Sequence, residues 1–70
     1  MQIGAPMKGE IVVVKVNPGD TVEAGQVVAV ISAMKMEMAV QSSVAGVVRA
    51  THINVGDKID AEDLLVELKE

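Results

Sequence analysis

Short runs of apolar, mostly β-branched residues alternate along the chain with turns that contain glycine and acidic residues. No segment combines the length and the 3.6-residue period of an amphipathic helix. Strands this short, at this spacing, are typical of a small sandwich or flattened barrel. The sequence therefore predicts an all-β domain, with strands expected at residues 10–16, 21–22, 27–32, 38–42, 47–53 and 64–68.

Two of these runs depart from the alternation that a regular strand requires. The residues that look like core positions lie five apart in each run, as Ile11 and Val16 and as Val48 and Ile53. Because successive side chains of a strand point to opposite faces, a regular strand cannot bury both members of such a pair. The pattern predicts a β-bulge or bend in each run. The last run instead has apolar residues at alternate positions, which are Leu64, Val66 and Leu68.

The whole pattern occurs twice, with a shift of 37 positions. Residues 5–31 align with residues 42–68, and glycines, turn residues and apolar positions coincide. A repeat in two copies usually means a small unit that buries its apolar face against its twin. We expect a single domain over residues 1–70, with the two copies arranged around a hairpin at residues 33–37. Lys35 lies at this junction, with 34 residues before it and 35 after it.

The turns of the two copies are similar but not identical. The turn at 17–20 has proline at its second and glycine at its third position, which predicts a type II turn. Its counterpart at 54–57 keeps the glycine and lacks the proline. The turn at 23–26 contains Gly25, whereas its counterpart at 60–63 has Glu62, so a difference in backbone between these two turns is expected.

Composition limits the size of the core and the range of functions. Half of the residues are apolar but none is aromatic, so the core must be built tightly from fourteen Val and five Ile with Leu, Met and Ala. The apolar runs are too short to span a membrane, and no targeting peptide is visible. The net charge of −4 argues against nucleic acid or an anionic membrane as a partner. The absence of cysteine excludes disulfides and thiolate catalysis and fits a reducing compartment.

Few residues could carry catalysis or bind a metal. His52 is the only histidine, and the Asp and Glu residues lie in turns without ligand spacing. A surface position on a strand is the favoured interpretation of His52, since Lys15 takes its place in the other copy. No motif supports a Ser-His-Asp arrangement with Ser32, Ser42 or Ser43. The sequence predicts neither a catalytic nor a metal-binding residue.

Lys35 is singled out by its neighbours as well as by its position. A lysine amine is protonated at neutral pH and is not a nucleophile unless it is desolvated or crowded, so an exposed lysine is normally a solubilising charge. Here, however, Met34 and Met36 flank it on the turn and Met38 follows. Exposed apolar side chains are costly, and methionine adapts to several partners. We interpret Met34 and Met36 as recognition residues; for Met38, core filling remains an alternative.

The segment Ala33-Met34-Lys35-Met36 closely resembles the biotin-attachment motif of biotin carboxyl carrier (biotinyl) domains in the biotin/lipoyl-attachment family. The similarity covers nearly the whole chain, including Ala5-Pro6-Met7, Gly9 and the Gly-Asp turns at 19–20 and 56–57. Within the family, residues 3–7 and 32–38 are most similar to the carrier domain of pyruvate carboxylase. The first half has no insertion between its strands, unlike acetyl-CoA carboxylase carriers, which bear a protruding thumb.

The resemblance implies a flattened barrel-sandwich of two four-stranded antiparallel sheets with pseudo-twofold symmetry. It implies that biotin protein ligase joins biotin to the side-chain amine of Lys35, with Ala33, Met34 and Met36 as the flanking recognition motif. The resulting swinging arm, with a reach of roughly 12 Å, would carry CO₂ from a biotin carboxylase site to a carboxyltransferase site. The domain itself would be non-catalytic. The implied compartment is the bacterial cytoplasm or the mitochondrial matrix.

Two other functions remain as alternatives. A lipoyl carrier domain of a dehydrogenase complex has the same fold and a lysine at the same tip, but that lysine is usually preceded by Asp and followed by Ala, where Met34 and Met36 stand here. An unmodified barrel-sandwich domain could serve only as an interaction module. In that case, replacing Lys35 by arginine would leave its behaviour unchanged. An independent enzyme is the least favoured, for want of an acid/base constellation.

Overall fold

A computed structural model describes residues 2–69 of the chain, which form eight short strands. The two ends of the expected domain, Met1 and Glu70, lie outside the described residues. The strands are β1 (Gln2–Gly4), β2 (Gly9–Val14), β3 (Thr21–Val22), β4 (Val27–Ala33), β5 (Met36–Gln41), β6 (Gly46–Thr51), β7 (Lys58–Ile59) and β8 (Leu64–Lys69). A helix long and apolar enough to cross a membrane does not occur between residues 2 and 69.

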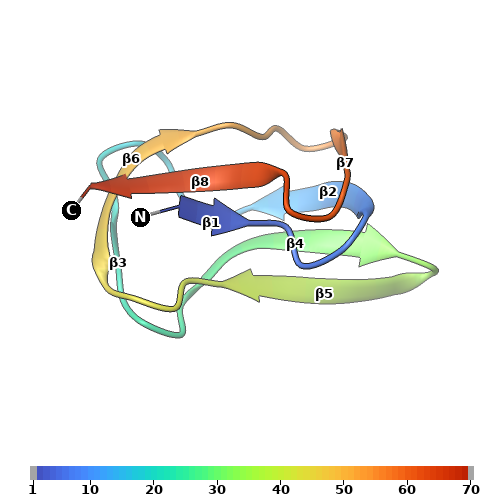
Figure 1. Cartoon of the computed structure of the whole chain (residues 1–70), viewed down its shortest axis with the longest axis horizontal. Helices are drawn as coiled ribbons and strands as arrows, with labels where there is room; N and C mark the ends of the chain where they lie inside the picture. The colour runs from blue at the N-terminus through green and yellow to red at the C-terminus, as the bar shows by residue number, and fades with distance from the viewer. Residues whose placement is uncertain (1, 70) are drawn as a thin grey trace.

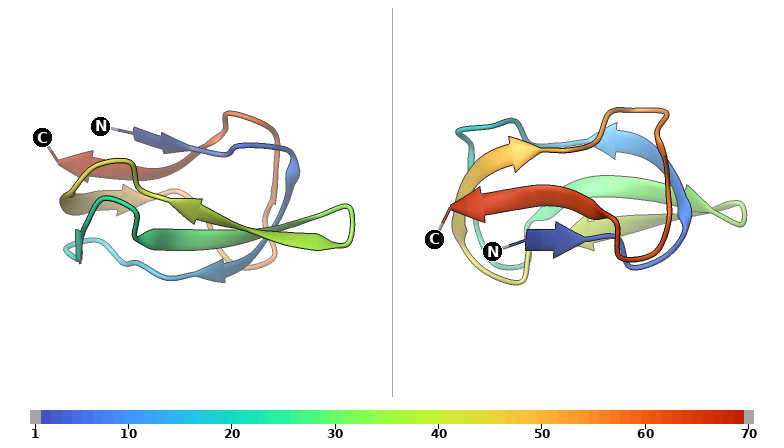
Figure 2. Two further views of the ribbon diagram at one scale, coloured as in Figure 1. Left: turned by 90° about the horizontal axis from the view of Figure 1, so that it is seen from below. Right: turned by 45° about the horizontal axis from the view of Figure 1, so that its top comes forward.

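The strands pair antiparallel in two four-stranded sheets, ordered β1-β8-β6-β3 and β5-β4-β2-β7 (Figure 1). This arrangement confirms the predicted fold class. The molecule is elongated, with extents of 33 × 19 × 18 Å. The β4–β5 hairpin projects at one end of the long axis, and the two ends of the chain lie together at the other (Figures 1 and 2).

One bulge in each copy allows both apolar positions of the long runs to face the core. β2 has an extra residue, Val12, opposite β4, and β6 has an extra residue, Arg49, opposite β8. These two residues are 37 positions apart, so the bulges are equivalent. The predicted bulge is therefore confirmed in each copy, and the four positions that required it are all buried, namely Ile11, Val16, Val48 and Ile53.

A second pair of equivalent bulges turns two consecutive residues toward the core. Val28 is the extra residue of β4 opposite β5, and Leu65 is the extra residue of β8 opposite β1. As a result, Leu65 and Val66 are both fully buried, whereas Leu64 is only half-buried. The regular alternation of residues 64, 66 and 68 thus does not describe which side of β8 faces inward.

The turn after β2 has the predicted type II form, and the turn after β6 has the same form. Asp20 donates its backbone N–H to the carbonyl of Asn17 at 3.0 Å, and Asp57 donates to Asn54 at 3.1 Å. The glycine at the third position of each turn has a φ of 95° or 96°. Each turn has a second hydrogen bond, in which the aspartate carboxylate accepts from the N–H of the asparagine, at 2.9 Å in the first turn and 2.8 Å in the second.

The expected difference between the turns at 23–26 and 60–63 is wrong. Gly25 has a φ of 87°, and Glu62 adopts nearly the same conformation with a φ of 71°. Equivalent tertiary hydrogen bonds hold both turns. The N–H of Gly25 donates to the carbonyl of Ser42 at 2.7 Å, and the N–H of Glu62 donates to the carbonyl of Ala5 at 2.8 Å. The surrounding structure therefore imposes on Glu62 a conformation that glycine adopts at much lower cost.

Candidate functional site

The projecting hairpin ends in the tightest turn that joins antiparallel strands. Ala33 pairs with Met36, so only Met34 and Lys35 connect β4 to β5. Their φ values are 51° and 66°, which makes the connection a type I′ turn. Such turns normally contain Asn and Gly, because a left-handed conformation costs other residues roughly 1–2 kcal/mol each. Sequence reasoning predicted the hairpin but not this conformation, since neither Met nor Lys is a turn-forming residue.

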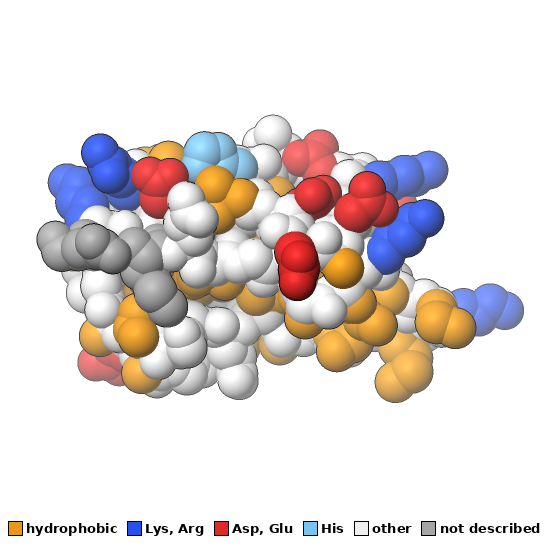
Figure 3. All heavy atoms as spheres, viewed as in Figure 1, with side chains coloured by type: hydrophobic (Ala, Val, Ile, Leu, Met, Phe, Trp, Pro, Cys, Tyr) orange, Lys and Arg blue, Asp and Glu red, His pale blue; other side chains and the backbone are white. Residues whose placement is uncertain are grey.

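The side chains at the tip are exposed. The exposed fraction is 90% for Met34, 68% for Met36 and 37% for Met38, and Lys35 is also exposed. Hydrophobic side chains gather visibly around the hairpin end of the molecule (Figure 3). Met38 is the most covered of the three methionines, yet it does not belong to the buried core cluster. The turn therefore combines a strained backbone with exposed apolar side chains.

The strand that leads to the tip is held against β2 by a close approach at Gly9. A Cβ atom on Gly9 would lie 2.5 Å from Cγ2 of Ile31 and 2.7 Å from the carbonyl oxygen of Ser32. No side chain fits in that space. Its counterpart in the second copy, Gly46, has no such neighbour, because a Cβ atom there would meet nothing nearer than 3.5 Å. Glycine is therefore required at position 9 by the packing of β2 against the end of β4, which we call the hairpin base.

A groove of about 610 Å³ lies beside this base, where the start of β2, the end of β4 and β7 meet. Sequence reasoning missed the groove. The available signal was that Met7-Lys8 occupies the position at which the second copy has Val44-Ala45. The lining combines apolar side chains with two lysines and two acids, and comprises Met7, Lys8, Gly9, Glu10, Ser32, Ala33, Met34, Lys58, Ile59 and Asp60.

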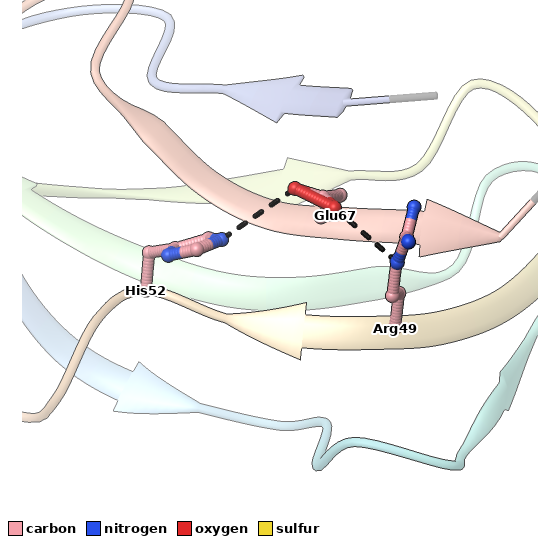
Figure 4. Close-up of polar contacts among 3 residues, drawn as sticks. All are labelled: Arg49, His52 and Glu67. Atoms are coloured by element: carbon pink, nitrogen blue, oxygen red, sulfur yellow. Dashed lines mark ion pairs between the residues drawn. The ribbon is translucent and has the colours of Figure 1, made fainter.

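The other polar residues considered from the sequence do not form a second site. His52 lies just beyond β6, as an exposed residue, and its Nε2 is 3.8 Å from one carboxylate oxygen of Glu67. Arg49 approaches the other oxygen of Glu67 at 3.7 Å (Figure 4). Pairs as exposed as these contribute little to stability. Ser42 is buried and bonded through its hydroxyl to the carbonyl of Val44, so it is not available as a nucleophile.

The acidic turn residues act on the backbone. Besides the two aspartates described above, Asp63 accepts a hydrogen bond from the N–H of Asp60 at 2.8 Å. Across residues 2–69, no three His, Cys, Asp or Glu side chains come together in a way that could hold a metal ion.

Comparison with known proteins identifies the family. Residues 1–68 match the biotin/lipoyl family, described as "Biotin-requiring enzyme". The chain is 48% identical over 67 residues to pyruvate carboxylase 1 of Caenorhabditis elegans, and 45% identical over 65 residues to the mitochondrial propionyl-CoA carboxylase alpha chain of Homo sapiens. These matches cover 96% and 93% of this chain but only 6% and 9% of the relatives. The crystal structure of Kluyveromyces lactis urea carboxylase superposes with a TM-score of 0.91 at 32% identity, covering 99% of this chain and 6% of that one.

The chain therefore belongs to the biotin/lipoyl family of biotin-requiring enzymes. It is a biotin carboxyl carrier domain of biotin-dependent carboxylases, whose cofactor is covalently attached biotin. The predicted similarity to the carrier domain of pyruvate carboxylase is confirmed as a similarity.

The tip of the hairpin fits covalent attachment of such a cofactor. Within the described part of the chain, the amine of Lys35 forms no ion pair or hydrogen bond. Acylation would therefore remove its charge without breaking a contact. The turn already presents the amine to solvent, so the domain need not rearrange to expose it.

Proposed function

We propose that Lys35 is the residue to which biotin protein ligase attaches biotin, and that Ala33, Met34 and Met36 are the flanking residues that the ligase or the carboxylase recognises. The observation that carries this proposal is the two-residue turn. It places a lysine and a methionine in the left-handed region at the most projecting point of the molecule, where stability alone would favour Asn-Gly. A strained, exposed and apolar turn is expected where contact with a partner matters more than stability.

We infer that the domain is a non-catalytic carrier. Beyond the bulge at Val28, the ladder between β4 and β5 runs without interruption from Ala29–Val40 up to Ala33–Met36, so the tip stands on a regularly paired hairpin. The rigid base limits motion to the arm itself, whose reach is roughly 12 Å. Tethering raises the local concentration of the carried group at each site that the domain visits. The domain's own contribution is thus presentation and delivery of CO₂, without bond-making.

The partners follow from the same inference. A biotin carboxylase and a carboxyltransferase, as domains or subunits, would load and unload the arm, and pyruvate is the proposed acceptor because of the similarity to pyruvate carboxylase. The chain spans only 6% of that relative's length, so the acceptor belongs to the proposal. We place the domain boundaries at residues 1–70 and the protein in the bacterial cytoplasm or the mitochondrial matrix. Neither nucleic acid nor membrane is a proposed partner, given the net charge of −4.

The intact mass after incubation with biotin, ATP and an active biotin protein ligase tests the proposal. The wild-type chain should gain the mass of one biotin less one water, and Lys35→Arg should gain nothing. Lys58→Arg is the matched control, because Lys58 is an exposed lysine at the same end of the molecule. It should be modified as readily as the wild type.

Stability measurements separate the role of Lys35 in attachment from a role in folding. Because its side chain has no partner in residues 2–69, Lys35→Arg should change the free energy of unfolding by no more than about 0.5 kcal/mol, as for surface sites in general. A large loss of stability would make Lys35 a structural residue. A wild-type chain that remains unmodified by the active ligase would contradict the proposal; modification by a lipoyl ligase instead would then identify a lipoyl carrier.

A further inference from the structure

We propose that the groove beside the hairpin is a resting site for the biotinyl arm of the same chain. The inference rests on the proposed attachment at Lys35. It assigns a function to side chains that neither the fold nor the tip requires. When the arm is not engaged in an active site, its ring system would lie between the start of β2, the end of β4 and β7.

The size and lining of the groove suit a small bicyclic group with one polar edge. Its volume of about 610 Å³ lies within the range of roughly 300–1,000 Å³ typical of small-molecule sites. Met7, Ala33 and Met34 provide apolar surface for the hydrocarbon chain and the sulfur-containing ring, and methionine adapts well to such shapes. Apolar contact would supply the attraction, and polar groups at the edge would set the orientation.

The charged residues of the groove match the polar edge of the group. The ureido ring of biotin has one carbonyl oxygen, which accepts hydrogen bonds, and two N–H groups, which donate them. An ammonium group such as that of Lys58 can donate to the oxygen, while carboxylates such as those of Glu10 and Asp60 can accept from the N–H groups. None of these three side chains forms an ion pair or side-chain hydrogen bond within residues 2–69, so all are available to a ligand.

The arm begins next to the groove. Met34 lines the groove and Lys35 follows it in the turn, so their Cα atoms are about 3.8 Å apart. An arm with a reach of roughly 12 Å can therefore fold back onto the neighbouring surface. Because the arm is tethered, its effective concentration there is on the order of millimolar, and weak contacts suffice to populate the docked position. The same weakness lets an active site withdraw the arm.

The pseudo-symmetry of the fold provides an internal comparison. The equivalent surface at the opposite end has Val44 and Ala45 in place of Met7 and Lys8, and Thr21 in place of Lys58. The scaffold thus forms with small, uncharged residues at these positions. At these three positions, the methionine and the two lysines occur only at the end that carries the attachment turn, which is where a docked arm would meet them; in the other direction, Lys69 is the counterpart of Ser32.

The experiment compares NMR spectra of three forms of the chain: unmodified, biotinylated, and carrying an acetyl group on the amine of Lys35. Acetylation removes the same charge but supplies no ring. We expect biotinylation alone to shift the amide signals of Lys58 and Ile59 and the methyl signal of Met7, while both modifications shift residues of the turn. Intact mass verifies that biotin is attached, so failed attachment is distinguished from failed docking.

Variants that adopt the residues of the second copy locate the docked arm. Met7→Val and Lys58→Thr should lose most of the biotin-dependent shift at Ile59, whereas Thr21→Lys at the opposite end should keep it in full. Well-dispersed spectra verify that each variant is folded. The proposal is overturned if the biotinylated and acetylated forms give the same signals in the groove, or if both groove variants retain the full shift.

Discussion

The two copies of the repeat have the same backbone conformation but differ in which side chains fit at equivalent positions of their turns and strands. Bulges, register shifts and tertiary hydrogen bonds recur at positions 37 apart, down to the bonds from Gly19 to Val48 and from Gly56 to Ile11, both at 2.8 Å. The sequences at these equivalent places are not the same. The comparison shows that the network of strand pairing determines the conformation, and that individual residues either suit it or are strained by it.

The two ends of the molecule differ in a second way. The pair β4–β5 at one end corresponds, after a shift of 37, to the pair β8–β1 at the other. The first pair is closed by Met34 and Lys35, and the second contains the ends of the chain (Figures 1 and 2). Of these two equivalent pairs, only β4–β5 is joined by a two-residue turn within residues 2–69. That asymmetry gives Lys35 a unique place on an otherwise repeated scaffold.

Substituting the glycines at the starts of β2 and β6 should give the largest difference in stability between equivalent positions of the two copies. Gly9→Ala places a methyl group 2.5 Å from a side-chain carbon of Ile31 and 2.7 Å from the oxygen of Ser32, so it should lower the free energy of unfolding by about 1–3 kcal/mol, as overpacking does. Gly46→Ala meets nothing nearer than 3.5 Å and should change stability by less than about 1 kcal/mol. Because the chain lacks aromatic residues, far-UV circular dichroism during urea denaturation is the suitable measurement.

The pair of variants is also informative about the hairpin. If Gly9→Ala is folded, its displaced β4 should shift the amide signals of the turn residues, whereas Gly46→Ala should leave them in place. Equal losses of stability in the two variants would mean that the close approach at Gly9 is relieved by movement of β4, and that packing of the hairpin base does not require glycine.

Substitutions in the turns at Gly25 and Glu62 should have smaller effects. Exchanging the residue type should lower stability in the first turn and raise it in the second. Gly25→Ala introduces a side chain into open space, so its cost is only that of the left-handed backbone, about 1–2 kcal/mol. Glu62→Gly removes that cost but makes the unfolded chain more flexible, which leaves a net gain below about 1 kcal/mol. Thermal unfolding of both variants checks the signs. A destabilised Glu62→Gly would show that the Glu62 side chain contributes more than its backbone strain costs.

Much of the architecture could be predicted from the sequence because the repeat and the odd spacing of Ile11 and Val16 constrain it. The bulges, the type II turns and the hairpin follow from positions of apolar residues and glycine. The conformation of Glu62 and of the Met34-Lys35 turn could not be predicted, because tertiary hydrogen bonds and strand register overrule local preference there. The groove escaped prediction for a different reason. It is formed by three segments distant in sequence, and none of them contains a recognisable ligand motif.

The smallest difference between the copies, proline at position 18 and valine at position 55, gives the last test. The two turns have third-position φ values of 95° and 96° and equivalent hydrogen bonds, so position 55 should also accept the φ of proline. Val55 is 66% exposed, and its removal loses little packing. Val55→Pro should therefore raise the free energy of unfolding by about 0.4–1 kcal/mol, chiefly by restricting the unfolded chain. The midpoint of urea denaturation should rise with an unchanged slope. A lower midpoint would mean that the second turn differs from the first at this position, and that the equivalence of the two copies ends at the residue before the glycine.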